Sequence, residues 1–200
     1  MKEVTGRSDR DLLAEMARTG RASEEAFTAI YRRHHDTVYR FALHMTYNTG
    51  AAEEVTQEVF LTLIREWPKF DPERGSLEAF LLGIGRNHVL RFLDRERAYV
   101  ALGAEGVPDD HPAMGNGNGD PLAALTQQER VTRVRAAVLS LPAAYREVVV
   151  LCDLQGKSYA EAAEAFACAI GTVRSRLHRA RGLLLQKLHS MGPVGIDEKP

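Results

Sequence analysis

The stretch that decides the fold is Ser158–Leu188, SYAEAAEAFACAIGTVRSRLHRARGLLLQKL. It predicts two helices joined by a tight turn, the first over residues 159–166 and the second starting near Gly171-Thr172, with Thr172 as the expected N-cap. In the second helix the apolar residues recur at three- and four-residue steps and so share one face: Val173, Leu177, Ala180, Leu184 and Leu188. A short helix followed by a longer amphipathic one predicts a helix-turn-helix.

The outer face of the second helix is basic and rich in hydrogen-bonding groups. Arginine reads guanine edges in the DNA major groove, serine and histidine accept several partners, and further arginines pair with phosphate. The candidate DNA-contacting residues are Thr172, Arg174, Ser175, Arg176, His178 and Arg179. Periodicity alone leaves a second interpretation open, because arginine-rich amphipathic helices are often simply solvated surfaces.

Charge is distributed unevenly along the 200 residues. The net charge is −1, with 44% hydrophobic and 26% charged residues, which indicates a globular chain. Residues 1–100 hold 15 Lys and Arg against 16 Asp and Glu, whereas residues 120–189 hold 10 against 6, a surplus of +4. The C-terminal half therefore suits a polyanionic partner.

Helical periodicity covers most of the remaining chain. Ser8 is the expected N-cap of a helix over residues 9–18, and Ser23 that of a longer helix with an apolar face that includes Phe27, Tyr31, His34 and Phe41. After a turn at residues 48–50, a helix ends at Trp67-Pro68, and its outer side carries Glu53, Glu54, Gln57 and Glu58. Such a side is usually solvated, but a basic partner helix can also dock on it.

A second basic segment precedes the middle of the chain. The loop Lys69–Gly75 leads into a helix that begins after Ser76. The first part of this helix is apolar, and its later part carries Arg86, Arg91, Arg95 and Arg97. Gly83 and Gly85 lie inside this helix, where each costs about 1 kcal/mol relative to alanine, so close helix packing is expected there. Residues 143–152 form a further helix whose core side should include Val148, Val149, Leu151 and Leu154.

These patterns predict an all-α chain of two small helical bundles. The first covers residues 8–100 and the second, which contains the helix-turn-helix, covers residues 121–189. Residues 101–120, rich in Pro, Gly, Asn and Asp, are predicted to be a flexible linker, and residues 190–200 a frayed tail.

Two segments together resemble a known family. LPAAYREVVVLCDLQGKSYAEAAEAFACAIGTVRSRLHRARGLL is similar to the C-terminal, promoter-reading domain of bacterial RNA polymerase sigma factors of the extracytoplasmic-function (ECF) type, within the sigma-70 family. AAEEVTQEVFLTLIREW, followed by FDPERGSLEAFLLGIGRNHVLRFLDR, resembles their N-terminal domain. The resemblance covers nearly all of residues 10–188 in the family order. Ala167 stands where the family's turn usually has glycine, which predicts a strained or differently shaped turn.

The resemblance implies partners and roles. The helix with Glu53, Glu54, Gln57, Glu58 and Leu61 would bind the clamp coiled coil of the polymerase β′ subunit, and the β flap would be a second polymerase contact. Lys69, Arg74, Arg86, Asn87, Arg91 and Arg95 would hold the minus-ten promoter element. The outer face of the helix-turn-helix would contact the minus-thirty-five element. An anti-sigma factor is a further family-level expectation.

Two other classes of function are alternatives to this one. A helix-turn-helix regulator would bind operator DNA without polymerase, usually as a dimer on paired half-sites. An enzyme is disfavoured, because the sequence offers no nucleophile–base pair, no metal-ligand spacing and no nucleotide loop. We therefore expect no catalytic residue, metal or cofactor. Cys152 and Cys168 are expected to be buried thiols of a cytoplasmic protein without membrane insertion.

Overall fold

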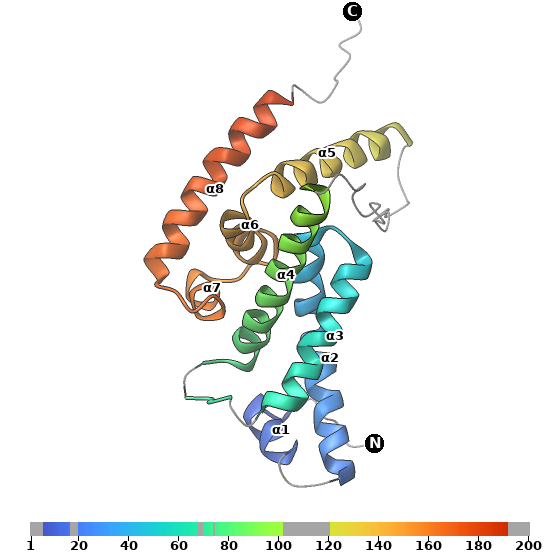
Figure 1. Ribbon diagram of the computed structural model, residues 1–200, viewed down its shortest axis with the longest axis vertical. Helices are drawn as coiled ribbons and strands as arrows, with labels where there is room; N and C mark the ends of the chain where they lie inside the picture. The colour runs from blue at the N-terminus through green and yellow to red at the C-terminus, as the bar shows by residue number, and fades with distance from the viewer. Residues whose placement is uncertain (1–5, 17–19, 68–69, 74, 102–120, 192–200) are drawn as a thin grey trace, which may run out of the picture.

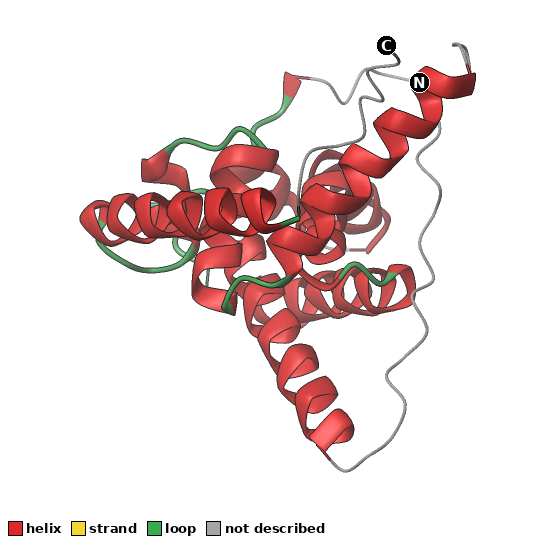
Figure 2. Cartoon of the chain, turned by 90° about the horizontal axis from the view of Figure 1, so that it is seen from above, coloured by secondary structure: helices red, strands yellow, loops and turns green. Residues whose placement is uncertain are grey.

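The computed structural model describes residues 6–16, 20–67, 70–73, 75–101 and 121–191. Their regular structure is helical throughout, with no strand among them (Figures 1 and 2). In chain order the helices are α1 (Asp9–Met16), α2 (Gly20–Thr46), α3 (Thr49–Glu66), α4 (Leu77–Ala101), α5 (Pro121–Leu139), α6 (Ala143–Val149), the π-helical turn η3 (Val150–Leu154), α7 (Tyr159–Ala165) and α8 (Ile170–Ser190). The all-α expectation is confirmed.

Short polar side chains begin several of these helices. Asn48 caps α3, where its Oδ1 accepts a hydrogen bond from the Ala51 amide at 2.8 Å, and Ser76 Oγ accepts one from the Ala79 amide at 3.2 Å. Ser158 and Glu161 form a capping box at the start of α7. The predicted boundaries near Asn48, Ser76 and Ser158 are therefore confirmed.

Three details differ from the sequence expectation. Helix α2 begins at Gly20, so Ser23 lies inside it instead of capping it. Helix α8 begins at Ile170 with Ala169 as N-cap, so Thr172 lies in the first turn and is not the cap. Leu154 is 40% exposed, because the π-helical turn η3 rotates it away from the core that Leu151 enters. The predicted linker, the tail beyond Met191, Lys69 and Arg74 lie outside the described residues.

The N-terminal bundle is built on α2, α3 and α4, which pack along one another, with α1 across the start of α2 (Figure 1). Its centre contains the fully buried side chains of Phe41, Leu63 and Leu81. A Cβ at Gly85 would lie 3.5 Å from Val59 Cγ2, so the close helix packing expected at this glycine is confirmed. A larger side chain there would force α4 away from α3.

The C-terminal bundle is built on α6 and α8, with α7 and α5 against α8. Val148, Leu151 and Leu177 are buried at its centre. In the turn between α7 and α8, Ala167 has φ of 49°, a left-handed conformation that residues other than glycine rarely adopt. The strained turn that the sequence predicted is therefore present.

The two bundles are packed against each other. Helix α4 runs along α7, and α2 contacts α6 and η3 (Figure 1). The ring of Phe41 in the N-terminal bundle lies 6.5 Å from that of Phe166 in the C-terminal one, and both belong to one continuous apolar cluster. Arg146 Nη1 also donates to the Met45 carbonyl at 2.6 Å. The sequence predicted both bundles but not this contact between them.

Candidate functional site

Helix α8 presents its basic face to solvent. Val173, Leu177 and Ala180 are buried against the bundle, as the periodicity predicted. Arg174, Ser175, His178 and Arg179 are exposed on the outer side. Ser175 Oγ donates to the Thr172 carbonyl at 3.0 Å, which leaves its lone pairs able to accept a further hydrogen bond. The structure thus brings four of the six predicted DNA-contacting residues onto one accessible face.

The two flanking arginines of α8 are held by carboxylates. Arg176 Nη1 donates to Glu147 Oε1 at 3.0 Å, and Arg176 is only partly exposed. Arg181 donates to both carboxylate oxygens of Asp153, at 3.1 and 2.6 Å, and this hydrogen bonding together with the charge of Asp153 raises the pKa of Arg181. Both arginines therefore tie α8 to α6 and η3.

A groove of about 570 Å³ runs between α2 and α3. Its lining is largely aromatic and aliphatic with a polar rim: Phe27, Tyr31, His35, Tyr39, Glu53, Thr56, Gln57, Phe60, Leu61 and Ile64. The predicted residues Glu53, Gln57 and Leu61 lie in this lining, while Glu54 and Glu58 belong to the same outer side of α3. Leu61 and Ile64 are 40% and 49% exposed.

Sequence reasoning missed the contribution of α2 to this groove. The ring centroids of Tyr31 and Phe60 lie 4.7 Å apart, and those of Tyr31 and His35 lie 4.9 Å apart. Tyr31 was assigned to the buried face but is 39% exposed. The four-residue spacing of Tyr31, His35 and Tyr39 was the available signal, since such residues stack along one side of a helix.

The described residues predicted to hold the minus-ten element lie on α4. Arg86 and Asn87 line a groove of about 440 Å³ with Phe70 and Phe80. Arg86 also donates to Glu147 of the C-terminal bundle. Further along, Arg91 is exposed, and Arg95 pairs with Glu54 of α3 at 3.7 Å. The structure therefore separates Arg86 and Asn87, which share a groove, from Arg95, which lies against the acidic side of α3.

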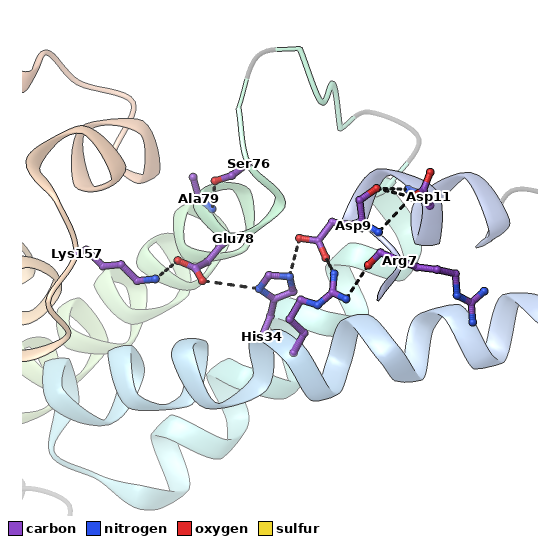
Figure 3. Close-up of polar contacts among 10 residues, drawn as sticks. Arg7, Asp9, Asp11, His34, Ser76, Glu78, Ala79 and Lys157 are labelled. Carbon is purple, nitrogen blue, oxygen red and sulfur yellow. Dashed lines mark hydrogen bonds and ion pairs between the residues drawn. The ribbon is translucent and has the colours of Figure 1, made fainter. Parts of the chain in front are cut away.

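A polar network centred on the buried His34 joins both bundles (Figure 3). His34, 4% exposed, contacts Asp9 Oδ2 through Nε2 at 3.0 Å, and its Nδ1 lies 4.0 Å from Glu78, which also pairs with Lys157. Burial raises the pKa of Asp9, but the hydrogen bond and charge of His34, together with Arg33, outweigh it and lower the pKa. The network connects α1, α2 and α4 with the loop before α7.

Among the described residues, no three His, Cys, Asp or Glu side chains are grouped so that they could hold a metal ion. The helices in the same ranges are each too short or too polar to cross a lipid bilayer.

Comparisons with known families agree with this geometry. The family described as Sigma-70 region 2 matches residues 30–99, and that described as Sigma-70, region 4 matches residues 132–184. These two matches coincide with the helices of the two bundles.

Related proteins carry ECF sigma factor names. SigM of Mycobacterium tuberculosis is 32% identical over 183 residues, which cover 91% of this chain and 85% of SigM. SigC of the same species is 29% identical over 182 residues, which cover 91% of this chain and 94% of SigC. SigE of Mycolicibacterium smegmatis is 34% identical over 160 residues, or 80% of this chain, but this chain spans only 60% of the length of SigE.

Solved structures show the same fold. The sigma factor RpoE, in complex with the anti-sigma factor NepR from Bartonella quintana, aligns with a TM-score of 0.62 at 26% identity over 84% of this chain and 98% of RpoE. CnrH, in complex with the cytosolic domain of CnrY, aligns with a TM-score of 0.65 at 26% identity over 92% of this chain and 99% of the CnrH chain. With two bundles in the family order and a relative matched over most of both chains, this protein belongs to the ECF sigma factors of RNA polymerase.

Proposed function

We propose that this protein is a transcription initiation factor that binds core RNA polymerase and directs it to specific promoters. The observation that carries the proposal is the presence, on one chain, of an exposed basic α8 face and of a largely apolar groove between α2 and α3 whose lining includes Glu53. The first surface suits DNA and the second suits a protein helix. The protein would reposition polymerase and melt DNA, while all bond-making chemistry would belong to the polymerase.

The minus-thirty-five element would be read by α8. Arg174 and Arg179 would make bidentate contacts with base edges, and Ser175 and His178 would contact bases or phosphate. Thr172 and Arg176 would contact the DNA from the edge of this exposed face. Arg176 donates a hydrogen bond to Glu147 at that edge. The domain responsible would span residues 121–189.

The polymerase would be bound by residues 8–100. An apolar groove whose rim carries Glu53 and Gln57 favours an amphipathic helix with basic flanks, which is the chemistry we assign to the clamp coiled coil of the β′ subunit. Leu61 would supply apolar contact, and Glu54 and Glu58 would supply charge. The β flap would hold the C-terminal bundle.

The minus-ten element would be held by α4 and the loop before it. Asn87 lies in a groove with two phenylalanine rings, which suits an unstacked base, and arginines along α4 would pair with the strand backbone. Lys69, Arg74, Arg91 and Arg95 are proposed for this backbone role together with Arg86. The protein would act in the cytoplasm, where it would meet core polymerase and promoter DNA, and an anti-sigma factor like the one bound to RpoE is a candidate regulator.

The test is run-off transcription from a pooled promoter library with bacterial core polymerase, with and without the protein. Discrete transcripts that require the protein, together with its co-elution with core, are the expected result. A helix-turn-helix regulator would instead bind operator duplexes alone and leave transcription by core unchanged. That outcome would make the regulator the correct assignment.

A further inference from the structure

We infer that the end of α2, where it meets α4, α5 and α6, carries a binding site for a compact, multiply charged phosphate group. The site is a cluster of cationic side chains, which we call the arginine junction: Arg40, His44, Arg97, Arg135 and Arg146. None of these five residues belongs to the exposed α8 face or lines the two grooves described above. Binding at this site would not require the proposed function, because it involves neither polymerase nor promoter DNA.

Arg135 of α5 lies at the centre of the arginine junction. Its guanidinium carbon is 5.9 Å from the ring centre of Tyr47, and the ring of Tyr47 lies 6.2 Å from that of His44. Burial lowers the pKa of His44, and the charges of Arg40 and Arg135 act in the same direction. These side chains of α2 and α5 are therefore close enough to feel one another's charge.

Arg146 of α6 forms the buried base of the arginine junction. It is 6% exposed, and its guanidinium donates to the carbonyl oxygens of Met45 at 2.6 Å, of Leu141 at 3.2 Å and of Leu139. Among the described residues, its Nε has no hydrogen-bond partner. Burial, and then the charge of Arg97, lower the pKa of Arg146. Its printed partners are neutral carbonyls, so no carboxylate among them offsets its charge.

Carboxylates are scarce around the arginine junction. Among the described residues, the charges that shift the pKa values of His44, Tyr47 and Arg146 belong to arginines and to Tyr47, and not to any Asp or Glu. One carboxylate reaches the edge, where Asp94 pairs with Arg97 at 3.4 Å. These two side chains are 74% and 62% exposed, and such a surface pair exchanges readily for another anion. A positive potential therefore remains where the four helices meet.

The rim of the arginine junction is open to solvent. Arg40 and Arg97 are exposed, and His44 and Arg135 are half-buried. Arg40 donates through Nε to the carbonyl oxygen of Asp36 at 3.2 Å, which is a neutral partner. An anion can therefore approach the outer side chains from solvent, while the buried member of the cluster adds positive potential from beneath.

The arrangement favours a compact anion over a nucleic-acid strand. The cations of the arginine junction converge from four helices, whereas the candidate DNA-contacting residues of α8 follow one another along a single helix. The planar guanidinium of arginine binds phosphate oxygens in bidentate pairs. A diphosphate presents several such oxygens and enough negative charge for more than one arginine. Inorganic pyrophosphate and the diphosphate of a nucleotide share this chemistry.

Calorimetric titration of the full-length protein with inorganic pyrophosphate at low ionic strength tests the site. We expect saturable binding of one pyrophosphate per chain, weakened at least about tenfold by Arg135→Gln, because this change removes the central charge-assisted contact. Arg130→Gln is the matched control, since Arg130 is exposed on the same helix and its replacement removes the same charge. Equal weakening by the two changes, or no saturable binding to the wild type, would overturn the inference.

Arg97→Gln provides a second variant if Arg135→Gln does not fold. Arg97 is exposed, so its replacement leaves the packing of α4 intact. We expect it to weaken pyrophosphate binding at least about threefold, because it removes one of the cations at the rim. Affinity equal to that of the wild type would remove Arg97 and the α4 side from the site and contradict the arginine junction as defined.

The titration of His44 gives a readout that a general effect of charge does not move. Pyrophosphate bound beside Arg40 and Arg135 would favour the imidazolium, so saturating pyrophosphate should raise the pKa of His44, measured by NMR. The pKa of His88, which burial and charged residues of α3 and α4 set, should stay unchanged. An unchanged pKa of His44, or an equal rise at both histidines, would overturn the inference.

A second ligand distinguishes the two sources of the phosphate. Adenosine diphosphate that binds more tightly than pyrophosphate would identify a nucleotide, and equal or weaker binding would identify the phosphate group alone, with the site upheld in both cases. Sulfate that competes as well as pyrophosphate would overturn the preference for a multiply charged phosphate. Because these titrations contain no polymerase, failure of run-off transcription would refute the proposed function and leave the site intact.

Discussion

The guanidinium of Arg86 donates two hydrogen bonds to the carboxylate of Glu147, a residue 61 positions away and fully buried. This pair joins α4 of one bundle to α6 of the other. Because Glu147 also accepts a bond from Arg176, one carboxylate binds two arginines that are candidates for DNA contact on sequence grounds. Under the proposed function, stability and access of DNA to these arginines would be coupled at this residue.

Glu147→Gln should destabilise the protein strongly, because it removes the carboxylate charge that binds both arginines while keeping the side-chain shape. We expect the free energy of unfolding in urea to fall by about 3 kcal/mol, as for other buried pairs that lose one partner. Glu164→Gln, at an exposed position, is the control and should lower the free energy of unfolding by less than about 1 kcal/mol. A loss at Glu147 no larger than that of this control would contradict the role given to Glu147.

Arg174→Ala and Arg179→Ala should each weaken binding of the polymerase complex to promoter DNA by about 1–3 kcal/mol and relax specificity at one base pair. The reason is that a side chain on the exposed face of α8 can reach a base edge. Competition binding with duplexes altered at single positions of the minus-thirty-five element measures this. Equal losses on every sequence would assign the arginine to phosphate instead.

Glu54→Lys should lower the affinity for core polymerase by about tenfold at moderate ionic strength, and high salt should reduce the difference, because surface charge is screened. Fluorescence titration of core with labelled protein measures both effects. Glu25→Lys, also exposed but on α2 and not on the acidic side of α3, is the matched control. Unchanged core affinity in Glu54→Lys would exclude the acidic side of α3 as the binding surface.

Ala167→Gly should stabilise the protein by about 1 kcal/mol, because a left-handed conformation costs alanine about 1–2 kcal/mol and costs glycine nothing comparable. Thermal unfolding at fixed pH measures the gain. Ala160→Gly, at an exposed site inside α7, should instead lose about 1 kcal/mol of stability. Destabilisation by Ala167→Gly would show that the turn carries no strain.

Stability should decrease as pH falls below 6.5 because of His44. Burial, together with the charges of Arg40 and Arg135, lowers the pKa of His44 from 6.5, so the unfolded chain binds a proton at a pH where the folded protein does not. The contribution of His44 to the free energy of unfolding is complete above pH 6.5. It is lost as the pH falls through the pKa that His44 has in the folded protein. Urea unfolding of wild type and His44→Gln between pH 5 and 8 measures it.

His44→Gln should flatten this dependence without abolishing it. Burial also lowers the pKa of His88, with the charges of Arg91 and Arg65 acting in the same direction, although Glu58 opposes them. In the His44→Gln variant, the titration of His88 therefore still gives part of the slope of the free energy of unfolding against pH. Identical slopes in wild type and His44→Gln would exclude His44 as a source of the pH dependence.

Local sequence patterns are sufficient to predict the helices and most of their buried faces. Residues at three- and four-residue steps, such as Val173, Leu177 and Ala180, lie on one side of any helix that contains them, so their burial follows from local geometry. Caps such as Asn48 and Ser158 act within three residues and were equally local. The outward side of α8 follows from the same periodicity.

The contacts of the polar residues depend on how the helices and bundles pack together. Arg86 and Arg176 look like free cations in the sequence, yet both bond to Glu147, which a helical pattern could not single out as their partner. The aromatic wall from α2 completes the groove beside α3 only because two helices pack side by side. Contacts across 61 or 88 positions depend on how the bundles dock, and periodicity carries no information about docking.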